Sequence, residues 1–192
     1  MSALGPDFRR DERERVGHIA ASWVAAGTLQ IGAYDMEAAM AGLPLVGGCM
    51  CGALRYEVSA PPLMVYNCHC TNCQKIGGAA FHTAATVMEA GLRFTAGDPA
   101  RVEWAADSGA IRFGWFCGAC GTRIANGGVP STGILSLRTG TLDDTSWVQP
   151  VGDTFTASAQ PWVRFVDGGL RSERAPDSYA PFMAAFKAQG LF

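Results

Sequence analysis

The sequence predicts a mainly β domain built from antiparallel strands, with short helices before and after it. From Leu45 onward the chain consists of short runs rich in β-branched and aromatic residues, which glycine and proline separate. Leu54, Tyr56 and Val58 alternate with polar residues, which is typical of a strand with one buried face. Apolar residues at helical spacing occur instead before Leu45, and a further helical stretch is expected near the C-terminus.

Residues 1–44 are expected to form an N-terminal helical appendage. Apolar residues such as Val16 and Ile19 lie at helical spacing, and Gly27 and Gly32 divide the segment, so two short helices are expected. The appendage packs either on the domain or on a partner subunit, and the second case would make the protein a homo-oligomer. A mobile extension is the alternative.

Residues 45–170 are expected to form the β domain, and residues 171–192 a C-terminal tail with a short helix. The expected strands lie in ALRYEV, LMVYNC, AAFHTAATV, LRFTAG, RVEWAAD, IRFGWFC, GILSLRTGTL and WVRFV. GGVPSTG (127–133) and DSGA (107–110) are expected to be loops. Pro181 suits the first turn of the tail helix.

Composition and charge exclude several classes of protein. A hydrophobic content of 48% is typical of a globular domain, and a net charge of -2 predicts no binding to nucleic acid or to an anionic membrane. No segment reaches the roughly 18 consecutive apolar residues that a membrane span needs. Free cysteines at metal-ligand spacing, with no pattern of a signal peptide, indicate a reducing cytoplasm.

The seven cysteines form three modules, and an odd number cannot pair completely into disulfides. The modules are Cys49 and Cys51, then Cys68, Cys70 and Cys73, then Cys117 and Cys120. The two modules with two cysteines supply four thiolates, enough for a closed tetrahedral zinc site that stabilises the fold. Gly52 and Gly121 follow these modules and permit the tight turns that such a site needs.

The middle module supplies three thiolates and leaves one position on a second zinc ion open, for water, a substrate or another residue. His69 lies between two of the expected ligands and should point to the opposite side, although a role as fourth ligand stays open. His82 is expected to be an ordinary strand residue. The competing interpretation of Cys68, Cys70 and Cys73 is a redox centre of three thiols without metal.

Three thiolates on one divalent cation leave a net charge of about -1, which makes the metal a weak Lewis acid for hydrolysis. A soft, exchangeable position suits a substrate thiolate instead. The middle module therefore favours chemistry on a thiol. No zincin motif, nucleophile elbow, P-loop or dinucleotide fingerprint in the sequence competes with this interpretation.

Five segments together resemble a known family. GGCMCGALRYEV, NCHCTNCQKIGGAAF, FGWFCGACGTRI, GTLDD and AQPWVRF occur in this order over about residues 45–166. They resemble the glutathione-dependent formaldehyde-activating family, which includes centromere protein V-like members. The resemblance implies a fold of two packed β-sheets, shared with methionine sulfoxide reductase B and Rab-associated zinc proteins. It assigns Cys49, Cys51, Cys117 and Cys120 to a structural zinc, and Cys68, Cys70 and Cys73 to a second zinc near which glutathione binds.

The resemblance also implies a carbon–sulfur lyase activity, the condensation of formaldehyde with glutathione to S-hydroxymethylglutathione. The expected catalytic residues are Cys68, Cys70 and Cys73, which would hold the zinc that binds the substrate thiol before it attacks a small carbonyl.

Other polar residues could assist this reaction. Asn72, Gln74, Lys75 or His69 could orient the carbonyl oxygen and move its proton. Lys75 or Arg123 could contact a carboxylate of glutathione, and an ordinary surface charge is the alternative for each.

Two other functions stay open at this point. The protein could be an enzyme of the same family that acts on a different small molecule without glutathione. It could also be a zinc-stabilised binding module without turnover. The middle module separates these cases, because a scaffold needs only the four-cysteine site.

Overall fold

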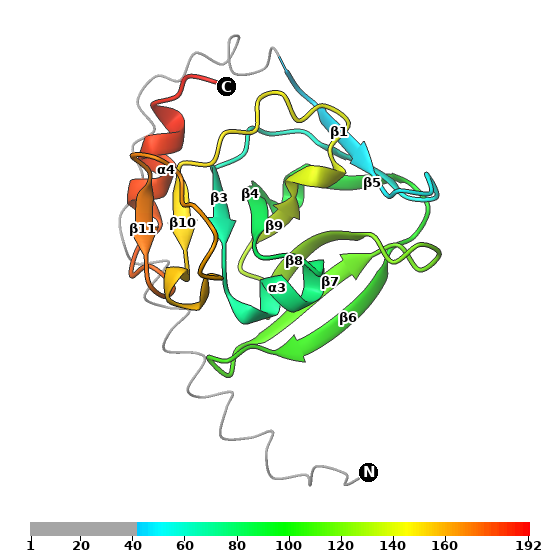
Figure 1. Ribbon diagram of the computed structural model, residues 1–192. Coiled ribbons are helices and arrows are strands. Elements are labelled where there is room, and N and C mark those ends of the chain that lie inside the picture. The colour runs from blue at the N-terminus through cyan, green and yellow to red at the C-terminus, as the bar shows by residue number, and fades with distance from the viewer. Residues whose placement is uncertain (1–41) are drawn as a thin grey trace, which may run out of the picture. The chain divides into compact units, whose positions relative to one another are not determined.

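The computed structural model describes residues 42–192, and the expected N-terminal helices lie outside these residues. The described chain is mainly β and contains two sheets (Figure 1). The mainly β fold expected from the sequence is therefore confirmed. No helix among residues 42–192 is long and apolar enough to cross a membrane.

The smaller sheet has three antiparallel strands in the order β1-β2-β5. Their bounds are Leu45–Gly48, Arg55–Val58 and Leu92–Ala96. The side chains of β2 alternate between half-buried and buried, as the pattern of apolar residues predicted.

The larger sheet has eight strands in the order β11-β10-β3-β4-β9-β8-β7-β6. Their bounds are Leu170–Ser172, Gly152–Thr154, Met64–Cys68, His82–Met88, Ile134–Arg138, Arg123–Val129, Ile111–Phe116 and Ala100–Ala105.

The strands from β3 to β6 pair antiparallel, whereas β10 pairs parallel with both β3 and β11. The sequence predicted antiparallel strands throughout. Parallel neighbours need a long connection, and residues 155–169 provide it between β10 and β11.

Two local expectations were wrong. WVRFV is not a strand, because the backbone N–H of Val166 donates to the carboxylate of Asp153 instead of joining a ladder. Residues 127–129 of the expected loop belong to β8, where Gly127 and Gly128 pair with β7.

The helices are few and short within the described residues. α3 (Thr71–Gly77) follows β3 directly, and α4 (Ala180–Lys187) lies near the C-terminus, where the tail helix was expected. Three 3-10 turns are η2 (Glu89–Gly91), η3 (Thr139–Thr141) and η4 (Thr156–Ser158).

The core lies between the two sheets. Phe94 of the smaller sheet makes edge contacts with Tyr56, at 6.5 Å between ring centroids, and with Trp115 of the larger sheet, at 5.5 Å. Helix α4 adds Phe182 and Phe186 to the same core.

The division of the chain into segments at residues 44 and 170 stays a prediction.

Candidate metal centres and the adjoining polar face

The first cysteine cluster joins two turns that lie far apart in the sequence. One turn follows β1 and the other follows β7. The cluster consists of Cys49, Cys51, Cys117 and Cys120, and their four Sγ atoms lie within 4.8 Å of one another. Gly52 and Gly121 both have positive φ, at 78° and 77°, so each turn uses a conformation that glycine adopts without strain. This cluster could hold a metal ion.

Hydrogen bonds favour the thiolate form of two of these sulfurs, those of Cys49 and Cys120. The Leu54 N–H donates to Cys49 Sγ at 3.2 Å, and the Thr122 hydroxyl lies 3.2 Å from Cys120 Sγ. The hydrogen bonds from Thr122 lower the pKa of Cys120 to about 5. Thr122 Oγ1 also accepts from the Met50 N–H at 3.2 Å, which ties the two turns together.

The second cluster forms where β3 ends and α3 begins. It consists of Cys68, Cys70 and Cys73, whose Sγ atoms also lie within 4.8 Å of one another. Cys70 is the residue before the first helical turn, and its Sγ accepts from the Cys73 N–H at 3.4 Å. Hydrogen bonds from the Cys68 and Cys73 thiols hold the pKa of Cys70 far below its usual value. This cluster could hold a metal ion with one position left for another ligand.

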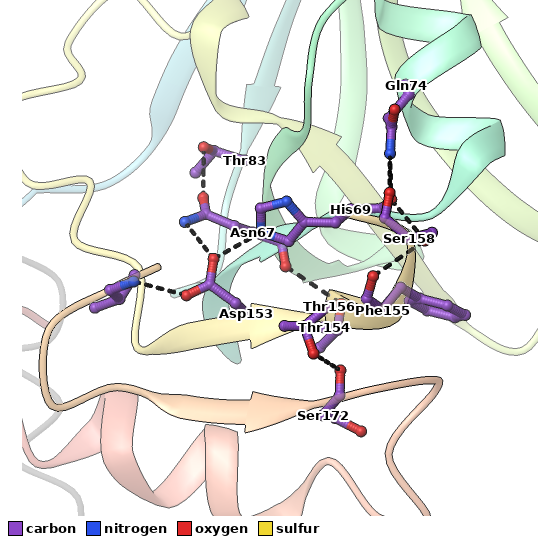
Figure 2. Close-up of polar contacts among 11 residues, drawn as sticks. Asn67, His69, Gln74, Thr83, Asp153, Thr154, Phe155, Thr156, Ser158 and Ser172 are labelled. Carbon is purple, nitrogen blue, oxygen red and sulfur yellow. Dashed lines mark hydrogen bonds and ion pairs between the residues drawn. The ribbon is translucent and has the colours of Figure 1, made fainter. Parts of the chain in front are cut away.

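His69 does not take that position. Its side chain is fully buried, and its ring packs against Phe81 and Phe165 at 5.1 and 5.4 Å between centroids. Its Nε2 lies 2.8 Å from Asp153 Oδ1, and neither ring nitrogen belongs to the sulfur cluster (Figure 2). Because the Asp153 carboxylate also accepts other N–H groups, Nε2 is the donor in this pair. The expectation that His69 points away from the metal is therefore supported.

Asp153 is the centre of a buried network around His69. Its Oδ1 also accepts from Asn67 Nδ2 at 3.2 Å, and its Oδ2 accepts from the Val166 N–H at 2.7 Å. The Thr83 hydroxyl donates to Asn67 Oδ1 at 2.8 Å (Figure 2). Asp153 is 0% exposed, so its carboxylate is shielded from solvent.

Hydrogen bonds from two other elements also fix the backbone between Cys68 and Cys70. The carbonyl oxygen of His69 accepts from Gln74 Nε2 at 2.6 Å and from the Ser158 hydroxyl at 2.9 Å (Figure 2). Ser158 lies in η4, which begins after Phe155 in the left-handed region at φ 58°. A bulky residue seldom adopts this φ, and such strain is common near functional sites. Gln74, which the sequence offered as a group that moves a proton, supports the loop instead.

A row of polar side chains extends from Cys68 across the larger sheet. Cys68 pairs with His82 on β4, and Ala84, two residues later, pairs with Arg138 on β9. Since directly paired residues and residues two apart share a face, Cys68, His82 and Arg138 lie on the same face. Burial first, and then the charge of Arg138, lower the pKa of His82 to about 3.

The row continues on β8 and β7. Ser136, two residues before Arg138, pairs with Asn126, which in turn pairs with Gly114. A bulge after Trp115 then pairs Phe116 with Arg123, which brings Arg123 to this face too. We call the face that carries Cys68, His82, Arg138, Asn126 and Arg123 the polar face.

The sequence indicates Arg123 as a candidate ligand for a carboxylate, but it does not indicate Arg138. Arg138 is only 4% exposed. Its alternation with Ser136 in the strand run GILSLRTGTL could have indicated a shared face, but not burial. Lys75, the other candidate, is exposed on α3, and Asn72 is half-buried in the first turn of the same helix.

A protein-family model matches the part of the chain that carries this site. The model described as "Glutathione-dependent formaldehyde-activating enzyme" matches residues 44–158, which include both cysteine clusters. None of the curated proteins matches the chain. A crystal structure of a Rhodobacter sphaeroides protein is 23% identical, over 52% of this chain and 88% of that chain, with a TM-score of 0.42.

Proposed function

The chain belongs to the glutathione-dependent formaldehyde-activating enzyme family, and we propose that it is a zinc-dependent enzyme of the carbon–sulfur lyase type. The reaction adds a thiol to a small carbonyl compound, with glutathione and formaldehyde as the first pair to test. A carbon–sulfur bond forms, the carbonyl π bond breaks, and the thiol proton ends on the carbonyl oxygen. No oxidant or reductant takes part.

The observation that carries this proposal is the three-cysteine cluster. A protein that needs zinc only for stability would need only the four sulfurs of the first cluster. Cys68, Cys70 and Cys73 bring three further sulfurs together beside the polar face. A zinc ion held by these three thiolates would supply a soft position that binds and ionises a substrate thiol.

The donor sets fit zinc in both clusters. Sulfurs at neighbouring corners of a tetrahedral zinc site lie about 3.8 Å apart, because each Zn–S bond is about 2.3 Å long. Cys49 Sγ lies 3.5 Å from Cys51 Sγ, which in turn lies 3.8 Å from Cys117 Sγ. We propose zinc for both clusters, with a structural role for the first.

Because all seven cysteines must stay reduced, we place the protein in the cytoplasm.

The residues of this chain position the reactants. The His69 carbonyl, held by Gln74 and Ser158, keeps Cys68 and Cys70 at a constant separation. Of the groups expected to orient the carbonyl oxygen, His69 and Gln74 support the loop. This leaves Asn72 and Lys75 on α3 for that role.

Exchange NMR can test this function, because it measures how fast glutathione and formaldehyde interconvert with their adduct. We expect the zinc-loaded protein to accelerate the exchange and Cys70→Ser to abolish the acceleration while the protein stays folded. Asn72→Ala, with all seven cysteines intact, should lower the rate and leave the metal content unchanged.

Cobalt in place of zinc separates the alternatives. Binding of a thiol at the second cluster should change the visible absorption of the cobalt protein. A spectral change with glutathione but no faster exchange would indicate a different carbonyl substrate. No change with any thiol, in protein that holds two metal ions, would contradict the proposal and favour a binding module without turnover.

A further inference from the structure

Two arginines of the polar face flank a single amide. The Asn126 side-chain oxygen accepts from Arg138 Nη2 at 2.6 Å, in the orientation that also lets its nitrogen donate to the Ala125 carbonyl. On the other side, the Arg123 guanidinium lies over Gly114, where a β carbon would clash with it and would approach the Asn126 amide to 2.8 Å. Glycine at position 114 therefore leaves the room that the Arg123 side chain occupies.

Neither guanidinium has a carboxylate partner among residues 42–192. The ion pairs recorded in this part of the chain use Arg55, Arg93, Arg101 and His69, and none uses Arg123 or Arg138. Arg138 Nε and Nη1 and Arg123 Nη1 are buried and have no hydrogen-bond partner. Arg138 is buried and Arg123 is half-buried, and without a carboxylate partner this pair is unfavourable, because each cation loses hydration and repels the other.

Neighbouring side chains position the two guanidinium groups but do not neutralise the charge of both. The Arg123 guanidinium lies 5.7 Å from the Trp104 ring centroid and 5.4 Å from that of Phe116, which orients it through cation–π contacts. Arg138 interacts with the side chain of Cys73 in the three-cysteine cluster, and this contact offsets part of its charge. Among residues 42–192, Arg123 has no anionic neighbour that raises its pKa.

Two further buried polar atoms on the same part of the sheet are unpartnered. They are the Trp104 Nε1–H donor, beside Arg123, and His82 Nε2, beside Cys68 in the ladder, which donates in one of its two tautomers. Buried guanidinium and indole N–H groups without acceptors fit an anionic ligand with several lone pairs. Planar guanidinium groups match the two oxygens of a carboxylate.

We propose that Arg123 and Arg138 form a carboxylate-binding subsite beside the three-cysteine cluster, so that the enzyme selects thiols that carry a carboxylate. This inference rests on the proposed function, because it names the class of thiol that the site takes. Because Arg138 contacts Cys73, one ligand can reach both sites. Its thiol would lie at the cluster and its carboxylate at the arginines, with only a few bonds between the two groups.

Two thiols of nearly equal shape test the subsite. 3-Mercaptopropionate carries the carboxylate, and 3-mercapto-1-propanol replaces it with a hydroxymethyl group. Calorimetry on the zinc-loaded full chain gives the dissociation constant of each, and propionate serves as a probe without a thiol. Because a charge-assisted hydrogen bond is stronger than a neutral one, we expect the acid to bind about tenfold more tightly than the alcohol, or better.

Variants assign this preference to the arginine pair. Arg123→Met should remove the preference and leave the affinity for the alcohol unchanged, and Arg123→Lys should keep part of it. Arg138→Lys, which keeps the buried charge and is expected to fold, should also weaken binding of the acid. Arg101→Met is the matched control, because Arg101 lies on the opposite face over Phe113 and pairs with Glu103.

The outcomes separate this inference from the function on which it rests. Equal affinities for acid and alcohol, with both thiols changing the cobalt spectrum, would overturn the subsite alone. Binding of propionate that Arg123→Met abolishes, with no spectral change from either thiol, would support the subsite and contradict the thiol chemistry. If neither the acid nor propionate binds the wild-type protein, the subsite is refuted.

Discussion

Asp153→Asn is a sharp test of how the fold supports the second cysteine cluster. The substitution preserves the shape of the side chain and replaces one carboxylate oxygen with an NH2 group. Asp153 accepts from His69 and Asn67 through one oxygen and from the Val166 N–H through the other. An asparagine can accept on one side only, so at least one buried donor loses its partner.

The expected cost follows from that count. An unpaired buried donor costs about 1–3 kcal/mol, and the bonds that remain lose the strengthening that a charged acceptor provides. We therefore expect Asp153→Asn to lower the free energy of unfolding by about 2–4 kcal/mol. Because His69 lies between two of the cysteines, the second cluster should also lose about 10–100-fold in metal affinity, as when a supporting hydrogen bond is removed.

Urea denaturation in excess zinc, followed by tryptophan fluorescence, measures the change in stability. Competition with a chromophoric chelator measures the metal affinity of the weaker site. Asp143→Asn is the matched control, because Asp143 forms an exposed ion pair with Arg55 and should cost at most about 1 kcal/mol. Stabilities of the two variants within about 0.5 kcal/mol of each other, with equal metal affinity, would refute the supporting role of Asp153.

Three further outcomes are expected. Metal analysis should find two zinc ions per chain and one in Cys70→Ser; a single ion in the wild type would contradict the two-site interpretation. Cys117→Ser should unfold or aggregate the domain, since a structural metal contributes folding free energy directly, and a soluble variant with native circular dichroism would argue against that role. Gly114→Ala should displace the Arg123 guanidinium and abolish the preference for 3-mercaptopropionate, with little loss of stability, because the clashing atoms include the end of a flexible side chain. Gly140→Ala, where an added β carbon meets open space, should leave that preference unchanged.

The cysteine clusters could be predicted because their information is local. Two cysteines separated by one or two residues, followed by glycine, already bring both sulfurs to one side of a turn. The sequence did not show which distant modules come together in space. Because two modules have two cysteines each and one has three, the simplest division was one site of four sulfurs and one of three. Helix α3 was missed, because seven residues without a buried side chain show no helical period.

The support of the second cluster could not be predicted in the same way. Asp153 lies 84 residues from His69, in a strand of three residues that pairs parallel with β3. Nothing in the run GDT distinguishes this carboxylate from one on the surface. Its role appears only when the crossover places β10 beside β3.

The sequence by itself determined the mainly β class, the two cysteine clusters and the family, because strand alternation and cysteine spacing act over a few residues. Tertiary structure alone decided what surrounds the three cysteines. Arg138 and Arg123 look like ordinary surface charges along the chain, yet the strand register and the bulge after Trp115 bring both to one face. Burial and charge at a site depend on residues far apart in sequence, and these two properties are the basis of the carboxylate-binding subsite proposed above.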